Sequence, residues 1–251
     1  MSVKKWCTAL FVAVMMSTTL VSAAEAAIEV SGDAYVGIYD KYLWRGIDFS
    51  AGQPVLQGGA DVSFKGFTLG FWSNMQLSHG GSDALDSGEV TETDIVLDYT
   101  FSPVDGLAVS LGNITYTFNI EDSATNEGYL GFALDALLSP NLMVYYDWDD
   151  EEGFYYTLDI SHGFALADSL DLNLSGLVSY SAQSPAVFAD DGSDFSDWST
   201  YELGLSLDYA VTDQIVISPS FLWSDTLSDD AEDVGMLEDE ILAGVSVSLN
   251  F

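Results

Sequence analysis

The feature that most constrains this chain is a two-residue alternation of apolar and polar side chains that recurs along its length. In the segment from Pro54 to Phe64, for example, Leu56 and Val62 share one face, whereas Gln57 and Asp61 share the other. A period of two indicates β-strands, because successive side chains of a strand point to opposite faces. We count about twelve such segments of roughly ten residues, the length that crosses a bilayer when a strand is tilted.

The connections between these segments mostly alternate between short and long. The short ones are Lys65-Gly66 and positions 102–106, 138–141, 165–169 and 210–214, and the longer ones cover 43–53, 76–91, 119–127, 149–152, 181–198 and 225–240. Outer-membrane barrels carry short turns on the periplasmic rim and long loops outside. The sequence therefore predicts an all-β fold, a transmembrane up-and-down antiparallel β-barrel of about twelve strands, with both termini on the periplasmic side.

A soluble β-sandwich is the alternative fold, in which the apolar faces of two sheets would pack on one another. It would require neither the alternating loop lengths nor so many ten-residue strands. Aromatic residues near segment ends also favour the barrel, because such residues form girdles at the two membrane surfaces. These aromatic residues are Phe64, Phe67, Tyr99, Phe101, Trp148, Tyr180, Tyr201 and Trp223. One segment is irregular, and its apolar face is expected to shift near Gly112-Asn113, before Ile114 and Tyr116.

The two ends of the chain carry export and assembly signals. Lys4 and Lys5 precede an apolar run from Ala9 to Val21 and then small residues, as in a secretory signal peptide. A transmembrane anchor is the alternative, but the run is short for one. We predict a signal peptide over 1–26, cleaved within 23–26, and a single barrel domain over 27–251. The terminal Phe251 resembles the signal that the bacterial barrel-assembly machinery reads.

The charge is very unbalanced, with 40 Asp and Glu against five Lys and Arg and a net charge of −35. Beyond the signal peptide, the basic side chains are Lys41, Arg45 and Lys65. This excludes a nucleic-acid partner, because neutralising phosphates requires clustered Lys and Arg. The single cysteine, Cys7, lies within the signal peptide, so the mature chain can build neither a disulfide nor a thiolate metal site.

Ten acidic residues fall on the polar faces of the expected strands. They are Asp33, Asp61, Asp94, Asp98, Asp135, Asp147, Asp159, Asp171, Glu202 and Asp208. That face must line the lumen, because a carboxylate against lipid costs a few kcal/mol near the bilayer midplane. A lumen lined in this way concentrates cations and repels anions. The alternative is a solvated polar lining without a role in selectivity.

Further acids crowd the long loops, at positions 149–152, 190–194 and 229–233. None of these runs has the spacing of a dedicated calcium loop, so we predict no fixed metal site and no cofactor, only diffuse binding of Ca²⁺ or Mg²⁺. An enzyme is also not expected. The two histidines, His79 and His162, have serine neighbours but lie in no nucleophile motif.

A local resemblance adds to this interpretation. Three stretches, 42–47 (Tyr-Leu-Trp-Arg-Gly-Ile), 53–59 (Gln-Pro-Val-Leu-Gln-Gly-Gly) and 70–74 (Gly-Phe-Trp-Ser-Asn), resemble the TorF-type porin family of proteobacteria. The resemblance covers about a fifth of the chain and implies an outer-membrane porin, with Trp44, Arg45 and Gly46 in its motif. Arg45, an isolated arginine among acids, is either a constriction charge or part of a structural ion pair.

The sequence therefore predicts a porin-like channel in the outer membrane of a Gram-negative bacterium. Its partners would be the membrane lipid, the barrel-assembly machinery and small hydrophilic solutes, which diffuse passively with a preference for cations or neutral molecules. The alternative is a non-conducting structural or adhesive barrel that displays acidic extracellular loops. Barrels of this size can be filled by their own side chains.

Overall fold

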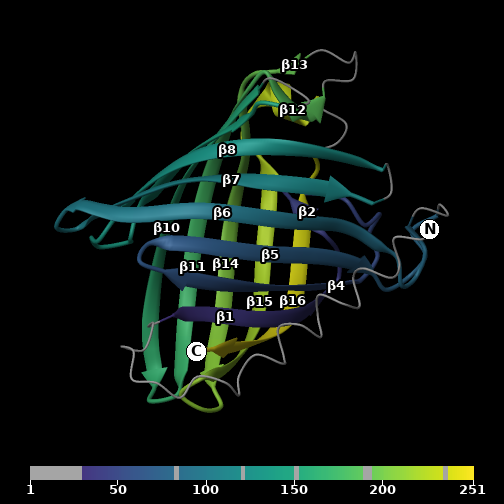
Figure 1. Ribbon diagram of the computed structural model, residues 1–251. Coiled ribbons are helices and arrows are strands. Elements are labelled where there is room, and N and C mark those ends of the chain that lie inside the picture. Colours follow the sequence, from purple (N-terminus) through teal and green to yellow (C-terminus); the bar gives the residue numbers. More distant parts are fainter. Residues whose placement is uncertain (1–29, 82–84, 120–121, 150–152, 189–193, 234–236) are drawn as a thin grey trace, which may run out of the picture.

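The computed structural model describes residues 30–81, 85–119, 122–149, 153–188, 194–233 and 237–251. Within them, twelve antiparallel strands close into one barrel in the order β1-β16-β15-β14-β11-β10-β9-β8-β7-β6-β5-β4 (Figure 1). The barrel strands are β1 (Ser31–Tyr39), β4 (Val55–Phe64), β5 (Phe67–Gln76), β6 (Val90–Val104), β7 (Leu107–Phe118), β8 (Ser123–Leu134), β9 (Asn141–Asp147), β10 (Gly153–Ala167), β11 (Leu170–Ala182), β14 (Trp198–Ala210), β15 (Ile215–Thr226) and β16 (Glu240–Asn250). The predicted fold and strand number are confirmed, and the β-sandwich alternative is wrong.

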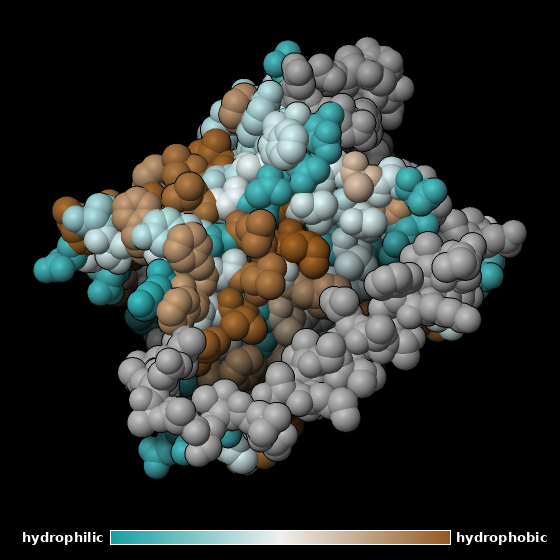
Figure 2. All heavy atoms as spheres, viewed as in Figure 1, coloured by the Kyte–Doolittle hydropathy of each residue, from teal (hydrophilic) through white to brown (hydrophobic). Residues whose placement is uncertain are grey.

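The alternation in the sequence places apolar side chains outside the barrel and polar ones inside. Residues paired across neighbouring strands share a face, so the register assigns every strand position to one side. On the outer face Phe67 is 62% exposed and Leu97 59%. In Figure 2, brown apolar side chains gather over the strands of one side, and teal ones lie mainly towards the strand ends. Closure also gives each of the twelve barrel strands a partner strand on both sides.

All eight aromatic residues expected at the membrane surfaces face outward. Near the short turns, the rings of Phe67 and Tyr99 lie 4.5 Å apart. Near the long loops, Tyr201 and Trp223 contact each other edge to face at 5.3 Å. The predicted two-residue turn is also present: Lys65 and Gly66 have φ of 50° and 86°, as a tight hairpin between right-twisted strands requires.

The expected shift of face near Gly112-Asn113 is wrong. Pairing between β6 and β7 runs without interruption through this region, so Asn113 lies opposite Leu97 on the outer face, and Ile114 faces the lumen. The alternation persists because a slip of one residue would reverse every later side chain. The outward polar groups satisfy one another: the Trp148 indole N–H donates to Asn113 Oδ1 at 3.0 Å.

The loops contain a few short elements. These are the hairpin of β2 (Leu43–Trp44) and β3 (Ile47–Asp48), the pair β12 (Ser184–Phe188) and β13 (Asp194–Phe195), and the single-turn helix α2 (Asp229–Glu232). No helix in the described ranges is long and apolar enough to cross a membrane. The predicted signal peptide, and most of the acidic runs at 149–152 and 190–194, lie outside the described residues.

Candidate functional site: the lumen beneath the first loop

The first long connection, between β1 and β4, folds into the barrel. Trp44 pairs with Ile47, and the two residues between them form a tight turn at the hairpin tip. Arg45 and Gly46 have φ of 53° and 84°, which a two-residue hairpin of this hand requires. A Cβ on Gly46 would lie 2.6 Å from Thr200 Cγ2 on the wall strand β14. The Trp-Arg-Gly motif therefore forms a hairpin tip packed against the lumen wall.

Arg45 connects this tip to the far wall. Its Nη2 donates to both carboxylate oxygens of Glu127 on β8, at 2.7 and 2.9 Å, and the two side chains are 9% and 5% exposed. The guanidinium carbon lies 4.3 Å from the ring centroid of Trp44, 4.1 Å from that of Tyr155 and 5.0 Å from that of Tyr145. A flat guanidinium suits such stacking together with a carboxylate contact.

Arg45 is permanently charged in this setting. Burial by itself lowers the pKa of Arg45, but the charge and hydrogen bond of Glu127, together with the neighbouring Tyr116 and Tyr155, outweigh burial and raise the pKa above its ordinary value. The structure thus contains the ion pair that was one of the two alternatives for Arg45. Because the pair lies within the lumen, it also leaves open a role for Arg45 at a constriction.

Tyr42 anchors the other side of the loop. Its ring lies 5.4 Å from that of Trp72 on β5, and its hydroxyl is hydrogen-bonded to the Glu92 carboxylate. Burial, followed by the charge of Glu92, raises the pKa of Tyr42. Nearby, the Tyr42 backbone N–H donates to Ser50 Oγ at 2.9 Å, and Gln76 Nε2 donates to the Ser50 carbonyl at 3.0 Å. The loop is thus attached to wall strands at both ends.

The other two motif stretches form the wall that receives the loop. Gln57 Nε2 donates to Asn74 Oδ1 at 3.2 Å, and Asn74 Nδ2 donates to Thr91 Oγ1 at 2.7 Å. At Gly59 a Cβ would come within 3.0 Å of the Tyr35 ring, so a larger residue would crowd the interior. Within these stretches Trp72 contacts the loop directly, through the Tyr42 ring, and the other residues build the wall around that contact.

Later loops cover the hairpin at the rim of the barrel that carries the long loops, here called the loop end. The opposite rim, which carries the short turns, is called the turn end. Ile47 packs with Phe195, Ala231 and Leu237 in a small buried apolar cluster. This cluster is made by loops, because the strands direct their apolar side chains outward.

The predicted lumenal acids lie where the alternation placed them, with one exception. Nine of the ten are on the inner faces of barrel strands, and Asp33 lies opposite Asp61, as Asp171 lies opposite Asp208. Asp135 follows the last residue of β8, at the turn rim, and is exposed rather than on a strand face. The connection between β8 and β9 begins at Asp135, whereas the apolar pattern predicted that it begins at position 138.

Three lumenal acids were missed by sequence reasoning: Glu92, Glu127 and Glu240. Each lies at or near the loop end of a strand, where strand boundaries are least certain from sequence. Glu92 and Asp94 are two residues apart and so share a face. Extending the alternation one step beyond the expected strand end would have found Glu92.

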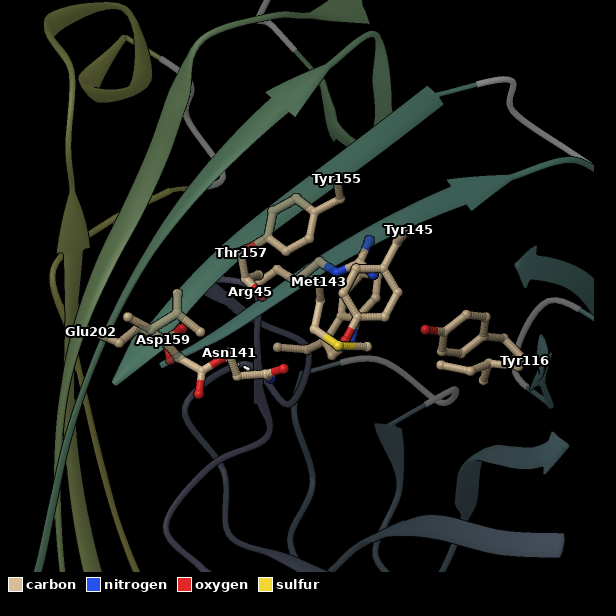
Figure 3. Close-up of a pocket in the computed structure, with 12 residues that line it drawn as sticks. Arg45, Tyr116, Asn141, Met143, Tyr145, Tyr155, Thr157, Asp159 and Glu202 are labelled. Atoms are coloured by element: carbon tan, nitrogen blue, oxygen red, sulfur yellow. Dashed lines mark hydrogen bonds between the residues drawn. The ribbon is translucent and has the colours of Figure 1, made fainter. Parts of the chain in front are cut away.

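A cavity of about 340 Å³ lies beneath the hairpin (Figure 3). Side chains that line it include Arg45, Asn141, Tyr145, Tyr155, Asp159 and Glu202. Asn141 is paired with Asp159, and Asp159 and Glu202 both pair with Leu177, so these residues form one row around the wall. In Figure 3 the two carboxylates lie together on one side of the cavity, away from the Arg45 guanidinium.

The histidines lie apart from this cavity. His162 is on the outer face of β10, with its ring 4.7 Å from that of Phe164. His79 Nδ1 lies 2.6 Å from Asp86 Oδ1 in an exposed loop. Neither is hydrogen-bonded to a serine among the described residues, and these residues contain no group of three or more His, Cys, Asp or Glu side chains close enough to hold a metal ion.

Comparison with known proteins places the chain in a family. Residues 22–239 match the family model described as "Bacterial protein of unknown function (Gcw_chp)". The chain belongs to this family. No curated protein matches the sequence.

Solved structures with the same fold include outer-membrane channels. The NanC porin superposes with a TM-score of 0.56 at 14% identity, over 88% of this chain and 100% of that one. The KdgM porin gives 0.53 at 12% identity, over 88% and 99%. An outer-membrane channel from Pseudomonas putida F1 gives 0.52 at 12% identity, over 91% and 97%. At such identities the likeness concerns the fold, and the TorF-type resemblance stays a prediction.

Proposed function

We propose that this barrel is an outer-membrane channel for passive diffusion of small hydrophilic solutes, with a preference for cations or neutral molecules. The observation that carries the proposal is the charge of the lumen. Nine predicted acids and the three missed ones face it, whereas Arg45 and Lys41 are each already paired with a carboxylate. The resulting negative potential attracts cations and repels anions.

The turn-end part of the lumen supports an open path. There the small or acidic residues Gly70, Asp98 and Ser206 face the lumen and retain contact with solvent. The fold shared with solved channels agrees with this proposal. One solved KdgM porin structure is a complex with oligogalacturonate, an anionic saccharide. We do not propose such a solute for this barrel, because its acidic lumen would repel an anion.

The second candidate, a non-conducting structural barrel with acidic loops, is favoured by a different observation. The first loop fills the loop-end part of the lumen, and Phe195 and Leu237 cover it. A barrel that remains closed in this way would act through its extracellular surface. Diffuse binding of Ca²⁺ or Mg²⁺ to the acidic loops would be part of that function.

Export and assembly remain part of the proposal. Phe251 exchanges two backbone hydrogen bonds of 2.9 Å with Gly32 and so extends the seam between β16 and β1. A terminal residue that joins the closing seam is well placed to act as the signal for the barrel-assembly machinery, after removal of a signal peptide over 1–26.

Single-channel recording of the refolded mature protein in planar bilayers, under a KCl gradient, tests the proposal. Discrete openings whose reversal potential indicates cation selectivity are expected. A barrel that is folded and inserted but never conducts would leave the structural alternative. Anion-selective openings would overturn the role assigned to the lumenal acids.

A further inference from the structure

The cavity beneath the hairpin has an uncompensated negative side. Asp159 accepts a hydrogen bond from Asn141 Nδ2 at 3.0 Å and another from its own backbone N–H, whereas Glu202 has no hydrogen bond or ion pair with any described residue. The nearest base in the lining, Arg45, is already neutralised by Glu127. The cavity therefore contains two carboxylates without a cation, on the side away from Arg45 (Figure 3).

One part of the lining is suited to an apolar group. Met143 and Tyr145 line the cavity between the carboxylates and the hairpin, and Leu177 lies in the row of carboxylates, paired with both Asp159 and Glu202. The volume of about 340 Å³ is within the range of small-molecule pockets, which combine apolar walls with a few directed polar groups. A hydrated inorganic ion would leave these apolar walls unused, whereas an anion would meet two carboxylates.

We propose that this cavity is a saturable binding site for small organic cations, with an ammonium head between Asp159 and Glu202 and a short apolar body against Met143, Leu177 and Tyr145. The inference rests on the proposed function, because the turn-end lumen provides the route by which such a solute reaches the site. It adds a defined ligand class to what would otherwise be unselective diffusion.

Binding of benzylammonium and of its neutral counterpart benzyl alcohol tests this proposal. Both are titrated calorimetrically into the full refolded barrel in detergent. Benzylammonium should bind saturably at one site, and benzyl alcohol about tenfold more weakly or not at all, because it lacks the charge. Equal binding of the two probes, or no saturable binding of benzylammonium, would overturn the proposal.

The key variant is Glu202→Gln, which removes a charge without removing a hydrogen bond. It should weaken benzylammonium binding about tenfold, whereas Asp213→Asn, in the exposed turn between β14 and β15, should not change it. A second variant, Leu177→Phe, should weaken binding by filling the cavity without altering charge. An equal loss in Asp213→Asn would indicate a general effect of net charge and would contradict a defined site.

Conductance separates this inference from the proposed function. A barrel that binds benzylammonium but never conducts would overturn the channel and keep the site. A barrel that conducts cations, yet neither binds benzylammonium nor is blocked by it, would overturn the site and keep the channel. Circular dichroism and the heat-dependent shift in gel mobility confirm that each variant is folded.

Discussion

The two halves of the lumen are built from the same alternating strands, yet they have different interiors. In the loop-end half, Gln76, Asn74 and Thr200 are at most 1% exposed, and the first loop packs against them. In the turn-end half, Asp98 and Asp208 keep contact with solvent. The difference shows that strand alternation makes a polar interior, whereas one inward-folded loop decides which part of that interior is filled.

The contact whose removal should have the largest effect is the ion pair between Arg45 and Glu127. Replacing Arg45 by Met leaves a buried carboxylate without its cation, which typically costs about 3–5 kcal/mol. We expect a lower urea midpoint in Arg45→Met and a larger single-channel conductance as the hairpin leaves the lumen. Tryptophan fluorescence during unfolding, together with bilayer recording, measures both effects.

The double variant Arg45→Met/Glu127→Gln is the control for this prediction, because it removes both charges together. It should recover much of the lost stability, since the remaining Gln can still be hydrogen-bonded by the Tyr116 hydroxyl, which donates to Glu127 Oε2 at 2.9 Å. A double variant as unstable as Arg45→Met would show that the guanidinium acts through packing on the aromatic rings rather than through charge.

Gly46→Ala tests how closely the hairpin tip fits the wall. Two costs are expected: a left-handed φ of 84° and a Cβ placed 2.6 Å from Thr200 Cγ2. Together these should destabilise the barrel by about 1–3 kcal/mol. Gly52→Ala is the matched control in the same loop, because Gly52 has a φ of 69° and a Cβ there would have no neighbour closer than 3.9 Å. If both variants lost equal stability, the tip would not be tightly packed.

The fold was predictable because the alternation of apolar and polar side chains is a local property, which can be read from the sequence of each strand by itself. Each pairing with a neighbour repeats the same assignment, so Asp61 or Glu202 could be placed in the lumen without knowing its partner. The shift of face predicted near Gly112-Asn113 was wrong because two polar residues, Asn113 and Thr115, occupy positions of the outer face. In the barrel they face outward, where Thr115 Oγ1 donates to Asn126 Oδ1 at 2.7 Å and Trp148 donates to Asn113.

The path of the first loop was not predictable, because positions 40–54 carry no periodicity. Its position depends on contacts between distant parts of the chain, such as Arg45 with Glu127, 82 residues later. The isolation of Arg45 among acids left two alternatives, a constriction charge or an ion pair, and Glu127 was not among the acids that the sequence placed in the lumen. Only the closed barrel and the turn at Arg45-Gly46 together select Glu127.

The two halves of the lumen should also differ in their contribution to ion selectivity, and the expected effect on permeability is smaller. Asp98→Asn/Asp208→Asn neutralises two acids of the turn-end half, and we expect the ratio of K⁺ to Cl⁻ permeability to fall about twofold. Asn at 208 can still accept the hydrogen bond that Asn173 Nδ2 donates at 2.8 Å, so folding should be retained. Glu92→Gln, in the packed half, should change the ratio less. Equal changes would mean that ions sample both halves.

The smallest effect is expected where the loop meets the barrel rim, at the ion pair between Lys41 and Glu240. Burial by itself lowers the pKa of Lys41, but the hydrogen bond and charge of Glu240 outweigh it and raise the pKa above its ordinary value of 10.5. A raised pKa means that the pair contributes fully below pH 10.5 and loses its contribution as the pH rises through the folded-state value. Since both side chains are partly exposed, at 19% and 16%, the contribution should stay under about 1 kcal/mol.

Unfolding of the unsubstituted protein and of Glu240→Gln, followed between pH 7 and strongly alkaline pH, measures this contribution. Ionisation of Tyr42 also weakens the fold at high pH, because its pKa is raised in the folded state. Both proteins share that loss, so the difference between them isolates Lys41. The difference should be constant near neutral pH and disappear in alkali. A difference that persisted unchanged in alkali would show that Glu240 holds the rim by its shape and not by its charge, and would leave Arg45 as the loop's electrostatic anchor.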